Sequence, residues 1–329
     1  MDYTLPAMSD QPDVTIPIGS EIRPFERQTG FANWNRFAAV NDEFIPIHMD
    51  DAEAVKVGQK AAFGMGNLRV AYLHDALEAW IDDLGGGGTI VEVAAQFRGL
   101  NFKGDTLTTT GSVTGVDAAE HGTLLHLKLS VTNQDGVDTT PSTATVVLWS
   151  DGDPVVPDEP PALAPSGAAT PGVHLTQAEI DLIDTTTAPI TAPPVDANDI
   201  RRWAIATHWP EPPPARFVDE AAASASPWHG LVAPRELDPF AWCPVRPWGG
   251  PWLRGMGAEP GTRILNGGQR SLYFAPMRPG DEITAVCRLV DVVEKDMKLG
   301  PTSIFTTEQR WTNQRDELVR IGFMTSLYY

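Results

Sequence analysis

Two acidic residues and a histidine lie close together near the start of the chain. Asp42 and Glu43 precede His48 by six and five positions in the run Asp-Glu-Phe-Ile-Pro-Ile-His, and Pro46 is expected to keep this run out of a helix. A carboxylate and an imidazole presented from one stiff turn can activate a water molecule or move a proton. The run therefore predicts a site of acid–base chemistry, although acidic residues near a histidine are also common in solvated surface turns.

An internal repeat places this run within a larger unit. The Gly-Asp pair at 104–105 recurs at 280–281, and the Asn-Gln pair at 133–134 recurs at 313–314, with nearly the same offset. Self-similarity at a fixed offset is the mark of a duplicated structural unit. The sequence therefore predicts two copies of one fold in tandem.

A segment of unusual composition separates the two copies. Residues 151–172 are rich in Pro, Ala, Gly and Asp, which is typical of an extended linker that crosses a surface. The first domain is accordingly expected at residues 14–150 and the second at residues 173–329.

Each copy is expected to contain the same elements in the same order. A short helix, at 34–40 in the first copy and 200–206 in the second, precedes a loop that contains proline. A longer helix follows, clearest at 68–82, where apolar residues recur at helical spacing. Runs of alternating apolar residues then predict strands, in the first copy at 90–97, 105–114, 124–132 and 144–149. One long helix followed by antiparallel strands predicts an α+β fold, with a sheet wrapped around a helix.

Residues 37–50 resemble the hydratase motif of MaoC-like proteins, which include the (R)-specific enoyl-CoA hydratases (hydratase 2) and the 3-hydroxyacyl-thioester dehydratases. Phe63-Gly64-Met65 resembles the His-Gly-Met that begins the central helix of that family, and the second copy resembles its dehydratase N-terminal-type domain. The resemblance implies a double hot dog protein made of two tandem hot dog domains. The second domain lacks the catalytic histidine, because Phe217 or Pro214 stands where His48 should recur.

The resemblance also assigns roles to individual residues. Aligned on Pro46 and His48, the catalytic Asp of the family falls on Glu43, so Glu43 or its neighbour Asp42 is the expected acid partner of the histidine. Gly64 is expected to donate its backbone N–H to the thioester oxygen. Contacts with the substrate are expected from the beginning and one side of the central helix, at Met65, Gly66, Asn67 and Tyr72.

The activity implied by the resemblance is the reversible hydration of a trans-2-enoyl thioester to the (R)-3-hydroxyacyl thioester. This is a hydro-lyase reaction of fatty acid or lipid metabolism, with coenzyme A or an acyl carrier protein as the carrier. It requires no cofactor and no metal, and the sequence offers no clustered ligands for a metal. Two alternatives remain at this stage: a hot dog acyl-thioesterase, or a non-catalytic partner that shapes the acyl tunnel of an active hydratase.

Composition bounds the compartment and the partners. The net charge of −19 argues against nucleic acid as a partner, and no apolar run approaches the ~20 residues that span a bilayer. The N-terminus lacks the pattern of a signal peptide, and Cys243 and Cys287 cannot form a disulfide framework. A cytoplasmic protein is expected, acting alone as a pseudo-dimer, as a homodimer, or in a hetero-oligomer with another hot dog protein.

Overall fold

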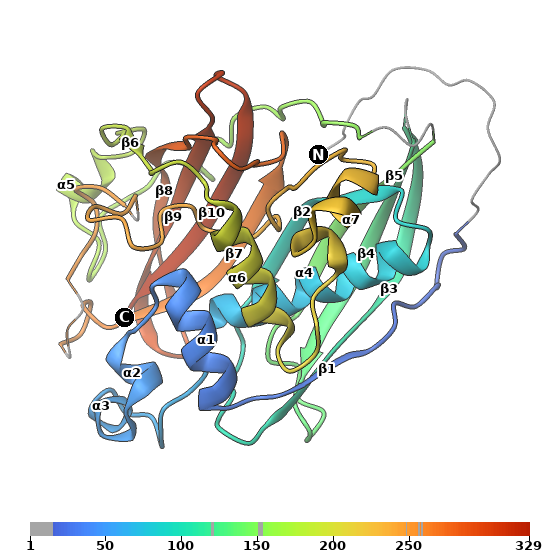
Figure 1. Ribbon diagram of the computed structural model, residues 1–329. Helices are drawn as coiled ribbons and strands as arrows, with labels where there is room; N and C mark the ends of the chain where they lie inside the picture. The colour runs from blue at the N-terminus through green and yellow to red at the C-terminus, as the bar shows by residue number, and fades with distance from the viewer. Residues whose placement is uncertain (1–15, 120–121, 151–153, 248, 256, 258) are drawn as a thin grey trace.

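The computed structural model describes residues 16–119, 122–150, 154–247, 249–255, 257 and 259–329. Within this part of the chain, ten strands form one continuous sheet, and the helices pack on one of its faces (Figure 1). The first half contains β1 (Phe25–Gln28), α1 (Phe31–Asn41), α2 (Pro46–Met49), α3 (Asp51–Lys56), α4 (Gly66–Asp83), β2 (Gly88–Gln96), β3 (Thr106–Ala119), β4 (Gly122–Thr132) and β5 (Ser142–Trp149). The second half contains α5 (Gln177–Ile180), β6 (Ile190–Thr191), α6 (Ala197–His208), the 3₁₀ helix η1 (Ala215–Phe217), α7 (Glu220–Ala225), β7 (Ile264–Tyr273), β8 (Thr284–Met297), β9 (Gly300–Thr312) and β10 (Leu318–Tyr328).

The strand order repeats the duplication that the sequence predicts. Across the sheet the order is β1-β3-β4-β5-β2-β7-β10-β9-β8-β6, so the two halves have the same order when each is followed outward from the centre. The halves meet where β2 pairs antiparallel with β7, from Glu92 opposite Leu272 to Gln96 opposite Gly268. The duplicated unit therefore contributes half of one shared sheet.

The repeated sequence pairs make the same hydrogen bonds in both halves. In the first half, Gln134 donates from Nε2 to Oδ1 of Asp105 at 3.0 Å and accepts from the backbone N–H of Thr106 at 3.1 Å. In the second half, Gln314 donates to Oδ1 of Asp281 at 3.1 Å and accepts from the N–H of Glu282 at 3.0 Å. The Gly-Asp and Asn-Gln pairs recur in the sequence because each copy uses them to make the same hydrogen bonds between two turns.

The long helix of the first half forms where its apolar spacing predicts it. α4 carries Leu68, Leu73 and Leu77 at helical intervals, and each is at most 2% exposed. The helix ends at Asp83, and after Leu84 come Gly85 and Gly86, whose backbones have positive φ angles of 103° and 77°. In Figure 1 α4 lies across the sheet. Its burial makes it the axis of the first half.

The second half has no counterpart of α4, contrary to the expectation that both copies share every element. After α7 the chain runs from residue 226 to residue 263 in turns and irregular segments, apart from three positions that the structure does not describe. Prolines recur through this stretch, and a proline inside a helix removes a backbone donor and clashes with the preceding turn. Leu237 and Phe240 from this stretch are buried in the core, at 3% and 0% exposure. Irregular chain therefore fills the place of the second helix.

A smaller correction concerns Pro46. The sequence was interpreted as keeping residues 42–48 out of a helix, but Pro46 is the first residue of the one-turn helix α2. Proline is compatible with the first position of a helix, because the N–H that it lacks has no partner there and its fixed φ already suits the helix. His48 is therefore presented from a helical turn.

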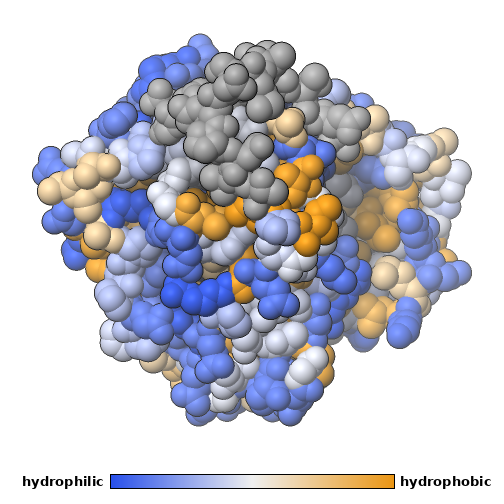
Figure 2. All heavy atoms as spheres, turned by 90° about the vertical axis from the view of Figure 1, so that its right-hand side faces the viewer, coloured by the Kyte–Doolittle hydropathy of each residue, from blue (hydrophilic) through white to orange (hydrophobic). Residues whose placement is uncertain are grey.

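The side of the molecule in Figure 2 is mostly hydrophilic, with groups of apolar side chains near its centre and toward its right edge. Among the residues that the structure describes, no helix has both the length and the apolar character needed to cross a bilayer.

Candidate active site

Glu43 enters the protein interior through a change of backbone direction at the end of α1. Asp42 adopts the left-handed conformation, with φ of 50° and ψ of 48°, which is accessible to Asp at a helix end. The next side chain, that of Glu43, is only 7% exposed. Its Oε2 accepts hydrogen bonds from Nδ2 of Asn41 at 2.8 Å and from Nδ2 of Asn67 at 3.1 Å. Two amides thus hold one carboxylate oxygen of Glu43.

The neighbouring acid occupies a different environment. The side chain of Asp42 is 29% exposed, and its Oδ2 lies 3.6 Å from Nη1 of Arg246 in the second half. Of the two acids that the sequence left open, Glu43 is the one bonded to the first turn of α4.

His48 is held from the other side of the same region. Its side chain is buried, and Nδ1 lies 2.7 Å from the backbone oxygen of Phe63. A carbonyl oxygen only accepts, so Nδ1 carries the hydrogen, and in the neutral ring Nε2 keeps its lone pair. The ring also packs edge-on against Phe63, with centroids 5.0 Å apart and planes at 85°. Phe63 therefore fixes both the tautomer and the orientation of the imidazole.

Both groups converge on the beginning of α4. Phe63, which holds His48, and Asn67, which holds Glu43, lie on either side of the first helical residue, Gly66. No side chain caps this helix end, so the first N–H groups of α4 have no partner within the helix. The end of the helix also carries a partial positive charge. We call Glu43, His48 and this helix end the first-half site.

Burial shifts both titrating groups of the first-half site toward their neutral forms. It raises the pKa of Glu43 from 4.5 to about 6, and the hydrogen bonds from Asn67 and Asn41 limit that rise. Burial lowers the pKa of His48, opposed by the hydrogen bond to Phe63 and reinforced by the positive charge of Arg69. At neutral pH the site therefore presents a carboxylate and an uncharged imidazole, both able to accept a proton.

The expected role of Gly64 needs correction. Its backbone N–H donates to the backbone oxygen of Asn101 at 2.8 Å, so it is not free for a thioester oxygen. Glycine is required here for a packing reason, because any side chain at this position would collide with the buried side chain of Asn101. The unpaired donors nearest to this point are those of the first turn of α4, beginning with Gly66.

The four expected substrate contacts fall into two groups. Gly66 and Asn67 are partly exposed at the beginning of α4, beside Glu43. Met65 and Tyr72 are buried in the core at 0% and 1% exposure, and Tyr72 packs against Phe25 with ring centroids 5.9 Å apart. Contact of any of these residues with an acyl group stays a prediction.

A loop of the second half contacts the C-terminal end of α1 beside the first-half site; the sequence suggested that this loop, at residues 239–260, narrows the substrate tunnel, which stays a prediction. Arg246 donates from Nη1 to the backbone oxygens of Asn41 and Asp42, both at 3.1 Å, and from Nη2 to Asp238 at 2.6 Å. Trp242 donates from Nε1 to the backbone oxygen of Ala39 at 2.9 Å. The concentration of Trp, Pro and Gly around residues 239–260 was the available signal, but it does not identify what the loop contacts.

Known proteins resemble this chain in fold and, over one region, in sequence. Residues 183–321 match the family described as the FAS1-like dehydratase domain region. A MaoC-like dehydratase aligns over 94% of this chain and 97% of its own, with a TM-score of 0.59 and 12% identity. A putative MaoC domain protein dehydratase from Chloroflexus aurantiacus J-10-fl aligns over 95% of each chain, with a TM-score of 0.63 and 12% identity. No curated protein sequence matches the chain.

A third similar structure has a named fold. A conserved hypothetical protein from Mycobacterium tuberculosis, described as having a double hotdog fold, aligns over 95% of this chain and 97% of its own, with a TM-score of 0.60 and 11% identity. Together with the symmetric strand order, this confirms the predicted pair of hot dog units. The chain therefore has the double hot dog fold, and its residues 183–321 match the FAS1-like dehydratase domain region.

Proposed function

We propose that this protein catalyses the reversible hydration of a trans-2-enoyl thioester to the (R)-3-hydroxyacyl thioester at the first-half site. The observation that carries the proposal is that Glu43 and His48, both buried, are held against the same helix end by Asn67 and Phe63. The dehydratase family matched by the second half supports the same class of reaction. Coenzyme A is the proposed carrier of the acyl group.

Addition of water across the double bond requires a base, an orienting acceptor and a proton for Cα. Nε2 of His48 accepts a hydrogen bond from one O–H of the attacking water, which stays intact, and the carboxylate of Glu43 takes the other proton as the oxygen attacks Cβ. The carboxyl group then delivers that proton to Cα. The oxygen of water becomes the 3-hydroxyl group, and the carboxylate of Glu43 is regenerated. The reverse sequence is dehydration.

The negative charge that develops on the thioester oxygen needs a donor. The proposed donor is the N–H of Gly66, the first residue of α4, because the N–H of Gly64 is already bonded to Asn101. Removing a donor of this kind typically costs roughly 3–4 kcal/mol of transition-state stabilisation. The positive end of the helix acts in the same direction.

The test compares two reactions of one substrate. Incubation with crotonyl-CoA, and separately with a bulkier enoyl-CoA, is expected to remove the absorbance of the conjugated enoyl thioester without releasing free thiol. Thiol release in place of hydration would establish a thioesterase. If neither change occurred with any enoyl thioester, a non-catalytic tunnel-shaping partner would be the better description.

The histidine is tested by a matched pair of variants. His48→Ala is expected to lower kcat for crotonyl-CoA by about 10²- to 10⁴-fold, because the water loses an acceptor that orients it. His126→Ala is the control, since His126 lies on β4, partly exposed, and pairs with Asp117 at 2.9 Å. Equal effects of the two changes would contradict the role given to His48.

A further inference from the structure

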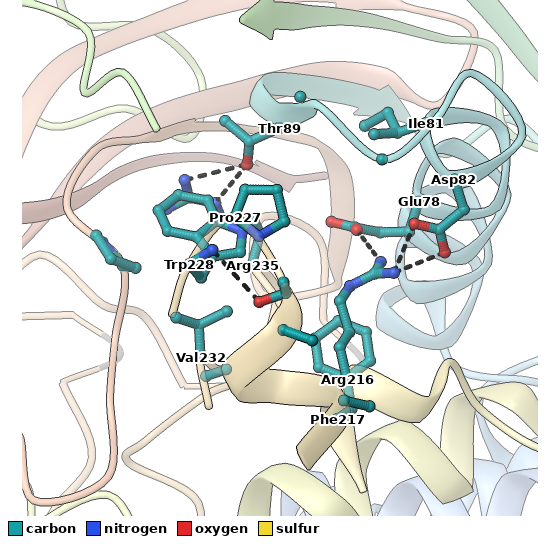
Figure 3. Close-up of a pocket in the computed structure, with 17 residues that line it drawn as sticks. Glu78, Ile81, Asp82, Thr89, Arg216, Phe217, Pro227, Trp228, Val232 and Arg235 are labelled. Carbon is teal, nitrogen blue, oxygen red and sulfur yellow. Dashed lines mark hydrogen bonds and ion pairs between the residues drawn. The ribbon is translucent and has the colours of Figure 1, made fainter. Parts of the chain in front are cut away.

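A cavity of about 370 Å³ lies at the opposite end of α4 from Glu43 and His48. Its walls come from the C-terminal end of α4, from η1 and α7, and from residues 226–235 (Figure 3). We call it the second-half cavity. Its volume falls within the range of small-molecule sites in proteins.

The second-half cavity occupies the position in the second copy that the first-half site has in the first. Asp50 caps α3 by accepting from the N–H of Ala52, and Asp219 caps α7 by accepting from the N–H of Ala222. Two residues before each capping aspartate, α2 contains His48 and η1 contains Phe217. Phe217 lines the cavity. The duplicated frame is retained here, but the imidazole is replaced by an apolar ring.

One end of the second-half cavity is acidic, and its two carboxylates share one arginine. Arg216 donates to Oε2 of Glu78 at 2.5 Å and to both carboxylate oxygens of Asp82 at 2.6 Å. Figure 3 shows these three side chains together on one side of the cavity. Both carboxylates at this end therefore already have a cationic partner.

The other end holds a buried cation that has no anionic partner. Arg235 is 9% exposed; its Nε and Nη2 donate to Oγ1 of Thr89 at 3.2 and 3.1 Å, and its Nη1 to the backbone oxygen of Phe274 at 2.9 Å. Its guanidinium carbon lies 5.3 Å from the centroid of the Trp228 ring. Within the described part of the chain, no carboxylate lies within ion-pair distance of Arg235, and both of its acceptors are uncharged; the carboxylate of Glu78 acts on it only from a longer distance.

The donors of this group are not exhausted. A guanidinium carries five N–H hydrogens, and these contacts use three of them, so Nη1 and Nη2 each retain one. The hydroxyl of Thr89 accepts from Arg235 and so keeps its own hydrogen to donate. A buried charge without a counter-charge is costly, and a planar guanidinium matches a carboxylate. The remaining wall, with Ile81, Phe217 and Val232, is apolar.

We propose that the second-half cavity is a non-catalytic binding site for an organic carboxylate with an apolar body. The carboxylate lies against Arg235 and the hydroxyl of Thr89, and the apolar body packs against Val232 and Phe217. Nothing in this proposal depends on the reaction assigned to the first-half site.

The first test varies the probe and leaves the protein unchanged. Calorimetric titration of the full chain with octanoate is expected to show binding, and octanamide is expected to bind about tenfold or more weakly, because it lacks the charge that Arg235 pairs with. Equal affinity for the two probes, or no octanoate binding, would overturn the proposal.

The second test locates the bound octanoate. Ala222→Leu places a larger side chain in the cavity wall and is expected to reduce the affinity about tenfold or more. Ser224→Leu makes the matched change on the exposed side of the same helix and is expected to leave the affinity unchanged. His48→Ala is likewise expected to leave it unchanged. Loss of octanoate binding in His48→Ala, but not in Ala222→Leu, would place the probe in the first-half site and contradict the proposal.

Discussion

The two halves differ most in the segment between the short capped helix and the first long strand. In the first half this segment leads into α4, whose beginning holds Glu43 and His48. In the second half it is irregular, and Trp228 and Arg235 from this stretch line the second-half cavity. The free helix end is what a developing negative charge requires. Without a second long helix in its described residues, the second half lacks this donor site as well as a structural element, so only the first half has all the groups that we propose for catalysis.

The largest expected effect tests whether catalysis belongs to the first half alone. Glu43→Gln is expected to lower kcat for enoyl thioester hydration by about 10²- to 10⁴-fold, because the base that receives the water proton is lost. Asp42→Asn is the matched neighbour and is expected to change kcat by less than about threefold, since Asp42 faces Arg246. Similar losses in the two variants would leave the acid unassigned. Substantial hydration activity remaining in Glu43→Gln would contradict the proposal that catalysis belongs to the first half alone.

The same substitution should make the protein more stable. Burial raises the pKa of Glu43 from 4.5 to about 6, so the folded state is penalised for carrying the carboxylate. Below pH 4.5 the group is protonated in both states and no penalty exists; as pH rises through about 6 the stability is lost. Glu43→Gln is therefore expected to raise the free energy of unfolding by up to about 2 kcal/mol at pH 7.5, and by little near pH 4. Urea denaturation at both pH values measures the difference, and a gain at pH 4 equal to that at pH 7.5 would contradict this cause.

A smaller effect tests how the first-half site sets its own pH range. Asn67 lowers the pKa of Glu43 by its hydrogen bond, so Asn67→Ala is expected to move the acidic limb of the kcat/KM profile to higher pH. The loss of activity should then be greater at pH 6 than at pH 8, by about tenfold or less. Asn198→Ala is the control, because Asn198 occupies the corresponding second position of α6 and is exposed. A pH-independent loss would show that Asn67 acts only in substrate binding.

Local patterns predicted much of the fold. Apolar spacing predicted a helix at 68–82 where α4 runs from Gly66 to Asp83, and alternation predicted β2 to β5 but not the short β1. The sequence did not predict that the second half, as far as the structure describes it, lacks a long helix. The repeated residues lie near the two ends of each copy, and the elements between them in the second copy were inferred from the first. The prolines of residues 226–263 were the feature of the sequence that argues against a helix there.

The candidate site was predicted less completely, because its details depend on contacts between distant residues. The motif identified Glu43 and His48. The choice between the two acids depends on the left-handed conformation of Asp42, the residue that ends α1. The engagement of Gly64 depends on Asn101, and the contacts to Asn41 and Asp42 depend on Arg246. Contacts between such distant residues produce no periodic pattern in the sequence that could predict them.

The pairing of β2 with β7 has a consequence for association with other chains. Each half uses the side of β2 or β7 that would otherwise be an exposed strand edge to complete the other half. The outermost strands of the shared sheet are β1 and β6, of four and two residues. Short edge strands offer few unpaired backbone groups to a neighbouring molecule. Fusing the two copies into one chain thus protects a large antiparallel sheet from growing edge to edge into aggregates.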